Sequence, residues 1–189
     1  MKKDFLILPV LLLLVGCTPD YLIEELGIIN TKGVDRTEEN QLLSTFIYYQ
    51  FDPEAKKLNE LVSAQSQTWK GTVIQANLKT NNRLVPDKLE TEVFGRPLAE
   101  QGIISIVDTL FRSAKTPDTT YFAVGEKNAE ELLTDLFKNE TGNVGNALKN
   151  LIEYNIDQEI IMNCRLRDFR HRYYKIGIDP VLPIIKMDN

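Results

Sequence analysis

The sequence has few of the residues on which most enzymes and metal proteins depend. It holds two cysteines and a single histidine in 189 residues, too few for a disulfide framework or for the usual ligands of a zinc site. Positive charge is also in the minority, since 22 Lys and Arg stand against 27 Asp and Glu, which argues against nucleic acid as the main partner. A content of 43% hydrophobic and 26% charged residues excludes a wholly disordered chain.

Catalytic motifs are missing as well. No Walker-type, dinucleotide-binding or EF-hand spacing occurs. His171 lies between Arg170 and Arg172, and nothing near it in the sequence resembles a nucleophile elbow, so a solvated helix face is the preferred interpretation over a general base. The adjacent acidic pairs have diverging side chains and are interpreted as solvated charges; they are Glu24-Glu25, Glu38-Glu39 and Glu130-Glu131. The sequence therefore predicts no enzyme, and no catalytic, cofactor-binding or metal-ligating residue.

The longest apolar run stands at the start of the chain. It covers eleven residues, Phe5–Val15, which is too short for a membrane span of about 20 residues and is typical of a secretory signal peptide at 1–16. Leu14-Val15-Gly16-Cys17 resembles the bacterial lipobox, in which the cysteine carries a diacylglyceride and the peptidase cuts before it. We predict lipidation of Cys17 by acyl chains such as palmitate, because two chains suffice for stable anchoring. An ordinary signal peptide is the other interpretation.

Processing would change the charge and the thiols of the mature chain. Loss of Lys2, Lys3 and Asp4 takes the formal net charge from −5 to −6. Cys164 is then the only free thiol, and we expect it to be a small buried apolar residue rather than a reactive one. The mature protein is predicted to lie outside the cytoplasm, tethered to a membrane.

Alternation of apolar and polar residues predicts strands. Leu26–Asn30 is expected to run as a strand into a turn at Gly33-Val34-Asp35. Gln41–Phe51 is apolar on both faces and is expected to lie centrally in a sheet. In Lys88–Phe94, alternation directs one set of side chains inward and Lys88, Glu90 and Glu92 to water. Thr119–Val124 is a further predicted strand.

Apolar residues at helical spacing predict five main helices. The predicted ranges are Thr68–Lys79, Ile103–Ala114, Ala129–Phe137, Val144–Ile152 and Met162–Ile176. Asn128 and Glu131 form a predicted capping box for the third, and Asn143 a predicted cap for the fourth. We expect a mixed α/β (α+β) fold with a mixed β-sheet of at least three strands and several amphipathic helices packed on it.

One local charge anomaly stands out in this acidic chain. The stretch from Arg165 to Lys175 carries Arg165, Arg167, Arg170, His171, Arg172 and Lys175. It could contact anionic lipid headgroups or an acidic partner, or it could be a solvated helix face. Exposed aromatics would mark a partner surface, but Trp69, Tyr48 and Tyr49 fit the core equally well.

Four stretches of the sequence resemble the N-terminal part of the Ger(x)C family of spore germination proteins. The first is the lipobox, and the second is Ile23-Glu24-Glu25-Leu26 leading to Gly33-Val34-Asp35. The others are Lys88–Gly95 followed by Leu98–Ile103, and Asp108–Arg112. Family members continue with further α/β domains. The resemblance thus implies a leader at 17–25, an N-terminal α/β domain at 26–177 and the start of a second, truncated domain at 178–189.

The resemblance implies a non-enzymatic role without a cofactor. Members are the lipoprotein C subunits of nutrient germinant receptors, anchored on the outer face of the spore inner membrane and assembled with integral-membrane subunits of A and B type. Of the family's functional positions, only Cys17 is carried over. The alternative is an extracytoplasmic solute-binding lipoprotein with its own ligand cleft, although such proteins commonly need two lobes. A lipid-anchored hydrolase is disfavoured by the single, poorly placed histidine.

Overall fold

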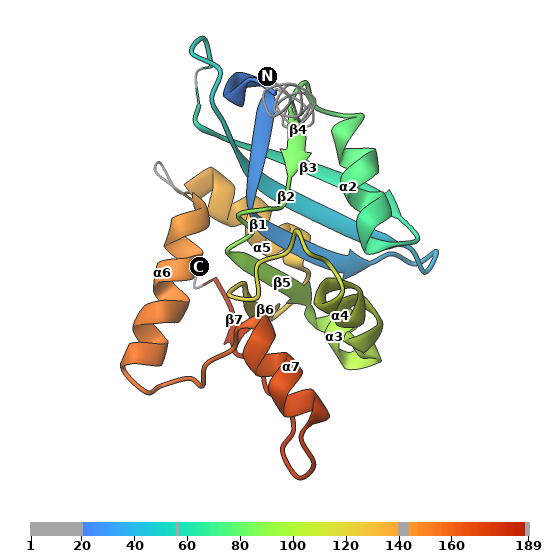
Figure 1. Cartoon of the computed structure of the whole chain (residues 1–189), viewed down its shortest axis with the longest axis vertical. Helices are drawn as coiled ribbons and strands as arrows, with labels where there is room; N and C mark the ends of the chain where they lie inside the picture. The colour runs from blue at the N-terminus through green and yellow to red at the C-terminus, as the bar shows by residue number, and fades with distance from the viewer. Residues whose placement is uncertain (1–20, 56, 140–143, 188–189) are drawn as a thin grey trace, which may run out of the picture.

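A mixed β-sheet covered by helices on both faces organises the chain (Figure 1). The computed structural model describes residues 21–55, 57–139 and 144–187. Within them the sheet has seven strands in the order β3-β2-β1-β5-β6-β7, with β4 pairing with β1 off this path. The predicted α/β fold with a mixed sheet is therefore confirmed.

The first half of the sheet is an antiparallel meander. It consists of β1 (Leu26–Arg36), β2 (Leu42–Gln50) and β3 (Asn59–Ser66). The predicted central strand at 41–51 is confirmed as β2, which has a neighbour on each side. The predicted turn at Gly33-Val34-Asp35 is wrong, because these residues continue β1 and pair with β2 on one side. Val34 is fully buried, so burial on both faces extends the strand past the glycine.

The second half of the sheet is parallel. From β1 it continues through β5 (Thr91–Gly95) and β6 (Tyr121–Gly125) to the short edge strand β7 (Ile184–Ile185), while β4 (Arg83–Val85) pairs with the start of β1. The two strands predicted at 88–94 and 119–124 correspond to β5 and β6. Ile184 and Ile185 pair with Val124 and Gly125, so the apolar end segment joins the same sheet. The start of a second domain at 178–189 stays a prediction.

Helices cover the two faces of the sheet unequally. On one face α5 (Ala129–Asn139) and α6 (Val144–Asp157) bury their apolar sides against β5 and β6. The other face is covered by α2 (Trp69–Asn77), α3 (Arg96–Gln101), α4 (Ile104–Phe111) and α7 (Leu166–Tyr174). All five predicted main helices are present, with ends shifted by several residues. A short 3-10 turn, η1 (Ile23–Glu25), precedes β1.

A side chain from β1 caps the start of α5. The Asp35 carboxylate accepts hydrogen bonds from the backbone N–H groups of Ala129 and Glu130, each at 2.8 Å. These two N–H groups are thus capped from a distant strand, and the capping box of Asn128 and Glu131 stays a prediction. Burial raises the pKa of Asp35, and the two N–H donors oppose that rise. Gly95 allows the contact, since a Cβ there would lie 1.8 Å from Asp35 Oδ1. The cap predicted at Asn143 lies outside the described residues.

Different elements form the two ends of the long axis of the molecule. The turn η1 and the start of β1 lie at one end, near β4, and α7 with the loop after it lies at the other (Figure 1). The first described residues are held to the sheet, since the Arg83 guanidinium lies 4.0 Å from the Tyr21 ring centroid and Asn82 Nδ2 donates to the Glu24 carbonyl at 3.3 Å. We call the first end the N-terminal end and the second the distal end.

Candidate functional site

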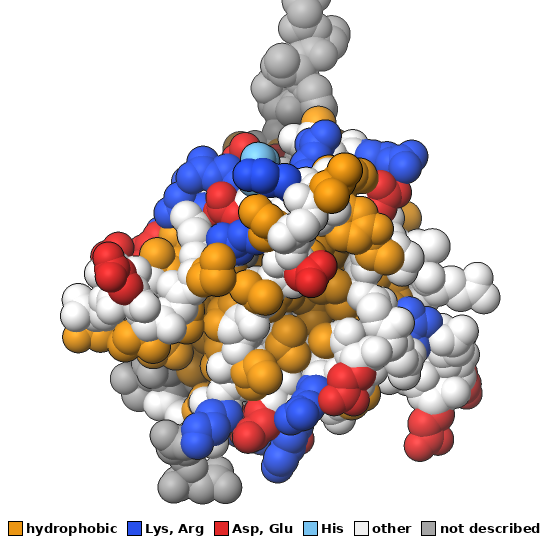
Figure 2. Space-filling view, turned by 90° about the horizontal axis from the view of Figure 1, so that it is seen from below, with side chains coloured by type: hydrophobic (Ala, Val, Ile, Leu, Met, Phe, Trp, Pro, Cys, Tyr) orange, Lys and Arg blue, Asp and Glu red, His pale blue; other side chains and the backbone are white. Residues whose placement is uncertain are grey.

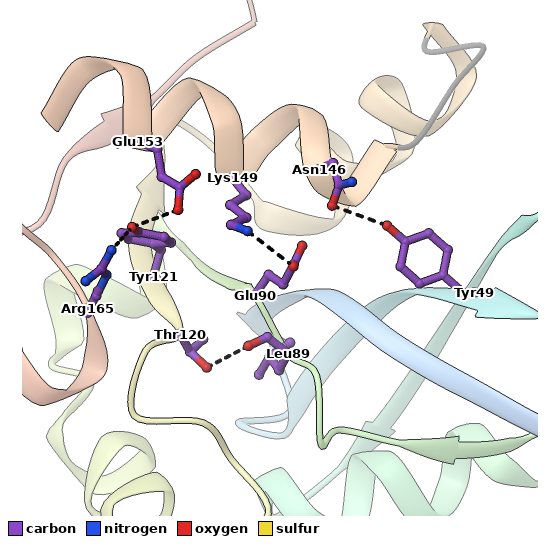
Figure 3. A network of polar contacts seen from close by, with 9 residues as sticks. All are labelled: Tyr49, Leu89, Glu90, Thr120, Tyr121, Asn146, Lys149, Glu153 and Arg165. Carbon is purple, nitrogen blue, oxygen red and sulfur yellow. Dashed lines mark hydrogen bonds and ion pairs between the residues drawn. The ribbon is translucent and has the colours of Figure 1, made fainter. Parts of the chain in front are cut away.

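A cleft with charges of both signs lies where β5 and β6 begin, beneath α6 (Figure 3). It has a volume of about 420 Å³. We call it the polar cleft; its charged lining consists of Asp87, Lys88, Glu90, Lys149, Glu153 and Arg165. The parallel register places Thr91 beside Tyr121, so the segments before these two strands meet at the same edge of the sheet.

Tyr121 stands at the centre of the polar cleft. Its hydroxyl donates to Glu153 Oε1 at 3.1 Å and accepts a hydrogen bond from Arg165 Nη2 at 2.5 Å (Figure 3). The Arg165 guanidinium also lies 4.9 Å from the Tyr121 ring centroid. Burial raises the pKa of Tyr121, which keeps the phenol neutral, although the bond from Arg165 acts against that rise. The hydroxyl therefore links α6 to the segment before α7.

Figure 3 shows three further contacts, and in one of them the Tyr49 hydroxyl donates to Asn146 Oδ1 at 3.5 Å. Lys149 Nζ lies 3.5 Å from Glu90 Oε1, which connects α6 to the segment before β5. Thr120 Oγ1 donates to the Leu89 carbonyl at 2.7 Å. Lys149 and Glu90 thus form a charged pair across the cleft, and Glu153 and Arg165 are joined through the Tyr121 hydroxyl. Such an arrangement suits recognition of a small molecule that carries both charges better than it suits activation of a nucleophile.

A second, larger cleft lies between α4 and α7 at the distal end. Its volume is about 670 Å³. Its apolar lining includes Leu110, Phe111, Leu166 and Tyr174, and its basic lining consists of Arg167, Arg170, His171 and Lys175. We call it the distal groove. The Phe111 and Tyr174 rings lie 6.2 Å apart, and the Arg170 guanidinium lies 5.5 Å from the Phe111 ring centroid.

The fold divides the basic stretch that the sequence presents as one unit. Four of its six residues line the distal groove. Arg165 is directed instead into the polar cleft, and Arg172 donates from Nη1 to the Asn163 carbonyl at 2.7 Å. His171 lies among the groove cations rather than beside a carboxylate or a nucleophile. Periodicity could place these residues on a helix, but only the tertiary contacts show which of them share a surface.

Two side chains of opposite charge are buried next to each other in the centre of the sheet. Lys32 on β1 and Glu92 on β5 are partners in the parallel register, and at most 1% of either residue is exposed. Lys32 Nζ lies 3.7 Å from the Trp69 ring centroid, and Trp69 Nε1 donates to Glu92 Oε1 at 2.7 Å. Burial lowers the pKa of Lys32 to about 7 and raises that of Glu92, while each charge moderates the shift of the other. The prediction that Glu92 faces water is wrong, because α2 covers this face of the sheet.

The remaining residues singled out from the sequence fall in or near the core. Cys164 is 1% exposed, and burial raises the pKa of its thiol to about 11, which confirms the expected buried, weakly reactive residue. Trp69 and Tyr48 are buried, so they belong to the core and not to an exposed partner surface. Cys17 lies outside the described residues. The sequence reasoning missed the polar cleft, because its members come from segments far apart in the chain and carry no local motif.

None of the helices in the described part of the chain has both the length and the apolar character that a membrane-spanning helix needs. No group of three or more His, Cys, Asp or Glu side chains among these residues is arranged to hold a metal ion.

Comparison with known proteins identifies relatives of the chain. The family described as the spore germination protein N-terminal domain matches residues 20–187. The spore germination protein GerQC of Bacillus cereus is 24% identical over 185 residues, which cover 98% of this chain and 51% of that protein. The chain therefore spans about half the length of this relative. No solved structure matches significantly. The match to nearly the whole chain means that it belongs to the Ger(x)C family of spore germination proteins.

Proposed function

We propose that this chain is a lipid-anchored, non-enzymatic subunit of a spore nutrient germinant receptor that acts by assembling with integral-membrane subunits of A and B type. The observation that carries the proposal is the family match over residues 20–187. It is supported by the lipobox, because Cys17 precedes the first matched residue by only three positions. The family match supports a role in spore germination. The lipid anchor and the assembly with membrane subunits are our inference.

The anchor would orient the domain. Tyr21 follows Cys17 by four positions, and four residues reach at most about 14 Å. Since Tyr21 packs on Arg83, a lipid on Cys17 would hold the N-terminal end near the bilayer. The family match and the secretory signal favour the outer face of the spore inner membrane as the location. The distal end would then face away from the lipid.

The anchor is tested by substitution of the lipidated cysteine. Cys17→Ala should abolish incorporation of labelled fatty acid, move the protein out of the spore membrane fraction and reduce nutrient-triggered germination to the level of a gene deletion. Cys164→Ala serves as the matched control, because its buried thiol should not affect the labelling. Retention of the label in the Cys17 variant would contradict the anchor.

Assembly is tested by purification from spore membranes. The tagged wild-type protein should bring down multi-span membrane proteins encoded beside it, and the Cys17→Ala variant should do so poorly. A deletion strain that germinates normally with every nutrient tested would contradict a receptor role, even if the protein is lipidated.

A second candidate function is direct capture of a small solute, and the polar cleft favours it. Cations and carboxylates line the same space of about 420 Å³, as a zwitterionic ligand requires. A ligand that binds only the folded state raises its melting temperature by mass action. Amino acids at a hundredfold excess over Kd should stabilise the wild type by about 2.7 kcal/mol, and Lys149→Met should reduce that effect. No shift with any amino acid would remove this candidate.

A further inference from the structure

The helix α7, which lines the distal groove, lies at the end of the long axis opposite to the N-terminal end (Figure 1). The inference below relies on the proposed anchor for its orientation. A lipid on Cys17 would keep the N-terminal end near the bilayer, and surface charge is felt only within a Debye length, about 8–10 Å. The groove cations would then lie beyond the reach of the headgroups. From the sequence, the basic stretch could contact either lipid headgroups or an acidic partner. This orientation favours the acidic partner.

The groove combines an apolar floor with available positive charge. Leu110 and Leu166 are buried in its lining, at 1% and 2% exposure, and the Phe111 and Tyr174 rings also line it, 6.2 Å apart. Among the described residues, Arg167 and Lys175 enter no ion pair, whereas Arg112 nearby is paired with Asp108 at 2.9 Å. Asp118 is the single carboxylate in the groove lining. In a chain of net charge −5, this concentration of unpaired cations is a local exception.

Large apolar side chains stand exposed around the groove. Figure 2, which views the molecule from below, shows a broad apolar area with Lys, Arg and His side chains along part of its border. Tyr174 is 64% exposed, and Ile176, at the tip of the loop after α7, is 100% exposed. Exposed apolar area of this kind, bordered by charge, is typical of surfaces that bind other proteins.

We propose that the distal groove docks an acidic segment of a protein partner. An apolar or aromatic side chain of that segment would pack beside the Phe111 and Tyr174 rings, and flanking carboxylates would pair with Arg167, Arg170 and Lys175. Arginine suits this role because its planar guanidinium binds a carboxylate through two hydrogen bonds. Complementary charge at the border fixes the partner's orientation, and the apolar centre supplies most of the binding energy.

Site-specific photocrosslinking in intact spores tests the groove in the full chain. Tyr174→benzoylphenylalanine places the probe in the groove, and the same substitution at Leu78 places it near the N-terminal end. Leu78 is a matched exposed position, since it is 77% exposed and follows Asn77, which accepts a bond from the Leu84 N–H of β4. We expect the Tyr174 probe to capture a partner peptide rich in Asp and Glu, identified by mass spectrometry, and the Leu78 probe not to capture it.

Charge variants show whether the capture depends on the groove cations. Arg167→Glu and Arg170→Glu are added to the variant that carries the probe at position 174. They should lower its yield of crosslinked partner by about tenfold or more, because each lost ion pair becomes a repulsion. Adding Arg167→Lys and Arg170→Lys keeps the charge and should retain much of the yield. Membrane fractionation and unfolding curves verify that both double variants fold and locate normally.

Three results would overturn the inference: a phospholipid adduct at Tyr174, an adduct with a second copy of the chain, or a partner peptide whose yield ignores the charge reversal. The proposed function fails separately. If the charge-dependent partner is a protein unrelated to the membrane subunits, or if Cys17 carries no lipid, the receptor assignment falls while the acidic docking segment stands.

Discussion

Two groups of positive charge in this molecule are placed in opposite ways. Lys32 is 1% exposed, lies opposite Glu92 in the sheet and lies against the Trp69 ring. Arg167, Arg170 and Lys175 lie at the surface, on an apolar groove. The first charge has its counter-charge and its ring within the same fold. The others are available to something outside it. The first charge thus has its partners within the fold, and the others can recognise a partner outside it.

The buried pair is costly for the fold. Lys32 Nζ and Glu92 Oε2 each lack a hydrogen-bond partner, so Coulomb attraction, the Trp69 ring and one hydrogen bond must offset the loss of hydration. Removal of one partner should therefore be much worse than removal of both. The groove cations keep their hydration and carry no such cost.

The largest expected effect comes from breaking the buried pair. Lys32→Met leaves Glu92 buried without a counter-charge and should lower the free energy of unfolding by about 3–5 kcal/mol, measured by urea denaturation. The double variant Lys32→Met with Glu92→Leu should recover most of that loss, since well-packed apolar residues often replace a buried ion pair without cost. Equal stability of the single and double variants would show that the pair is not coupled.

A smaller effect should appear as a dependence of stability on pH. The pKa of Lys32 is lowered from 10.5 to about 7 by burial, so between these pH values the unfolded chain binds more protons than the folded one. Stability should then rise with pH from about 7 towards 10.5, and this contribution is lost as pH falls through about 7. Unfolding curves across this range should show the rise in the wild type and not in the Lys32→Met, Glu92→Leu double variant. If stability rises equally with pH in the wild type and in the double variant, the rise comes from groups other than Lys32.

The fate of these two charge groups also shows what the sequence can and cannot predict. Local periodicity correctly located β2 and the five main helices, because each buries one face or both in a regular pattern. It misplaced Glu92, since alternation assigns polar residues to water unless something covers them. The cover, α2, comes from a segment more than a dozen residues earlier. Burial of a charged residue depends on such long-range packing.

The candidate sites were harder to predict than the elements that carry them. The basic residues of α7 were visible in the sequence, but the groove needs Phe111 of α4 beside Tyr174. The polar cleft needs Glu90, Tyr121, Glu153 and Arg165 to converge from different elements. No spacing rule joins residues so far apart. The parallel register of β5 and β6 brings Glu90 beside Tyr121, a separate bridge places Arg165 there, and Glu153 reaches the Tyr121 hydroxyl from α6.

The smallest expected effect on stability is the sharpest test of the difference between the buried charge and the groove cations. Arg167→Glu with Arg170→Glu reverses two surface charges and should leave the free energy of unfolding within about 0.5 kcal/mol of the wild type per substitution. The same double variant should lose crosslinking to an acidic partner, so stability and recognition would separate at the groove, whereas at Lys32 charge acts on stability alone. A large loss of stability would show that the groove cations, like Lys32, serve the fold, and the distinction between the two groups would disappear.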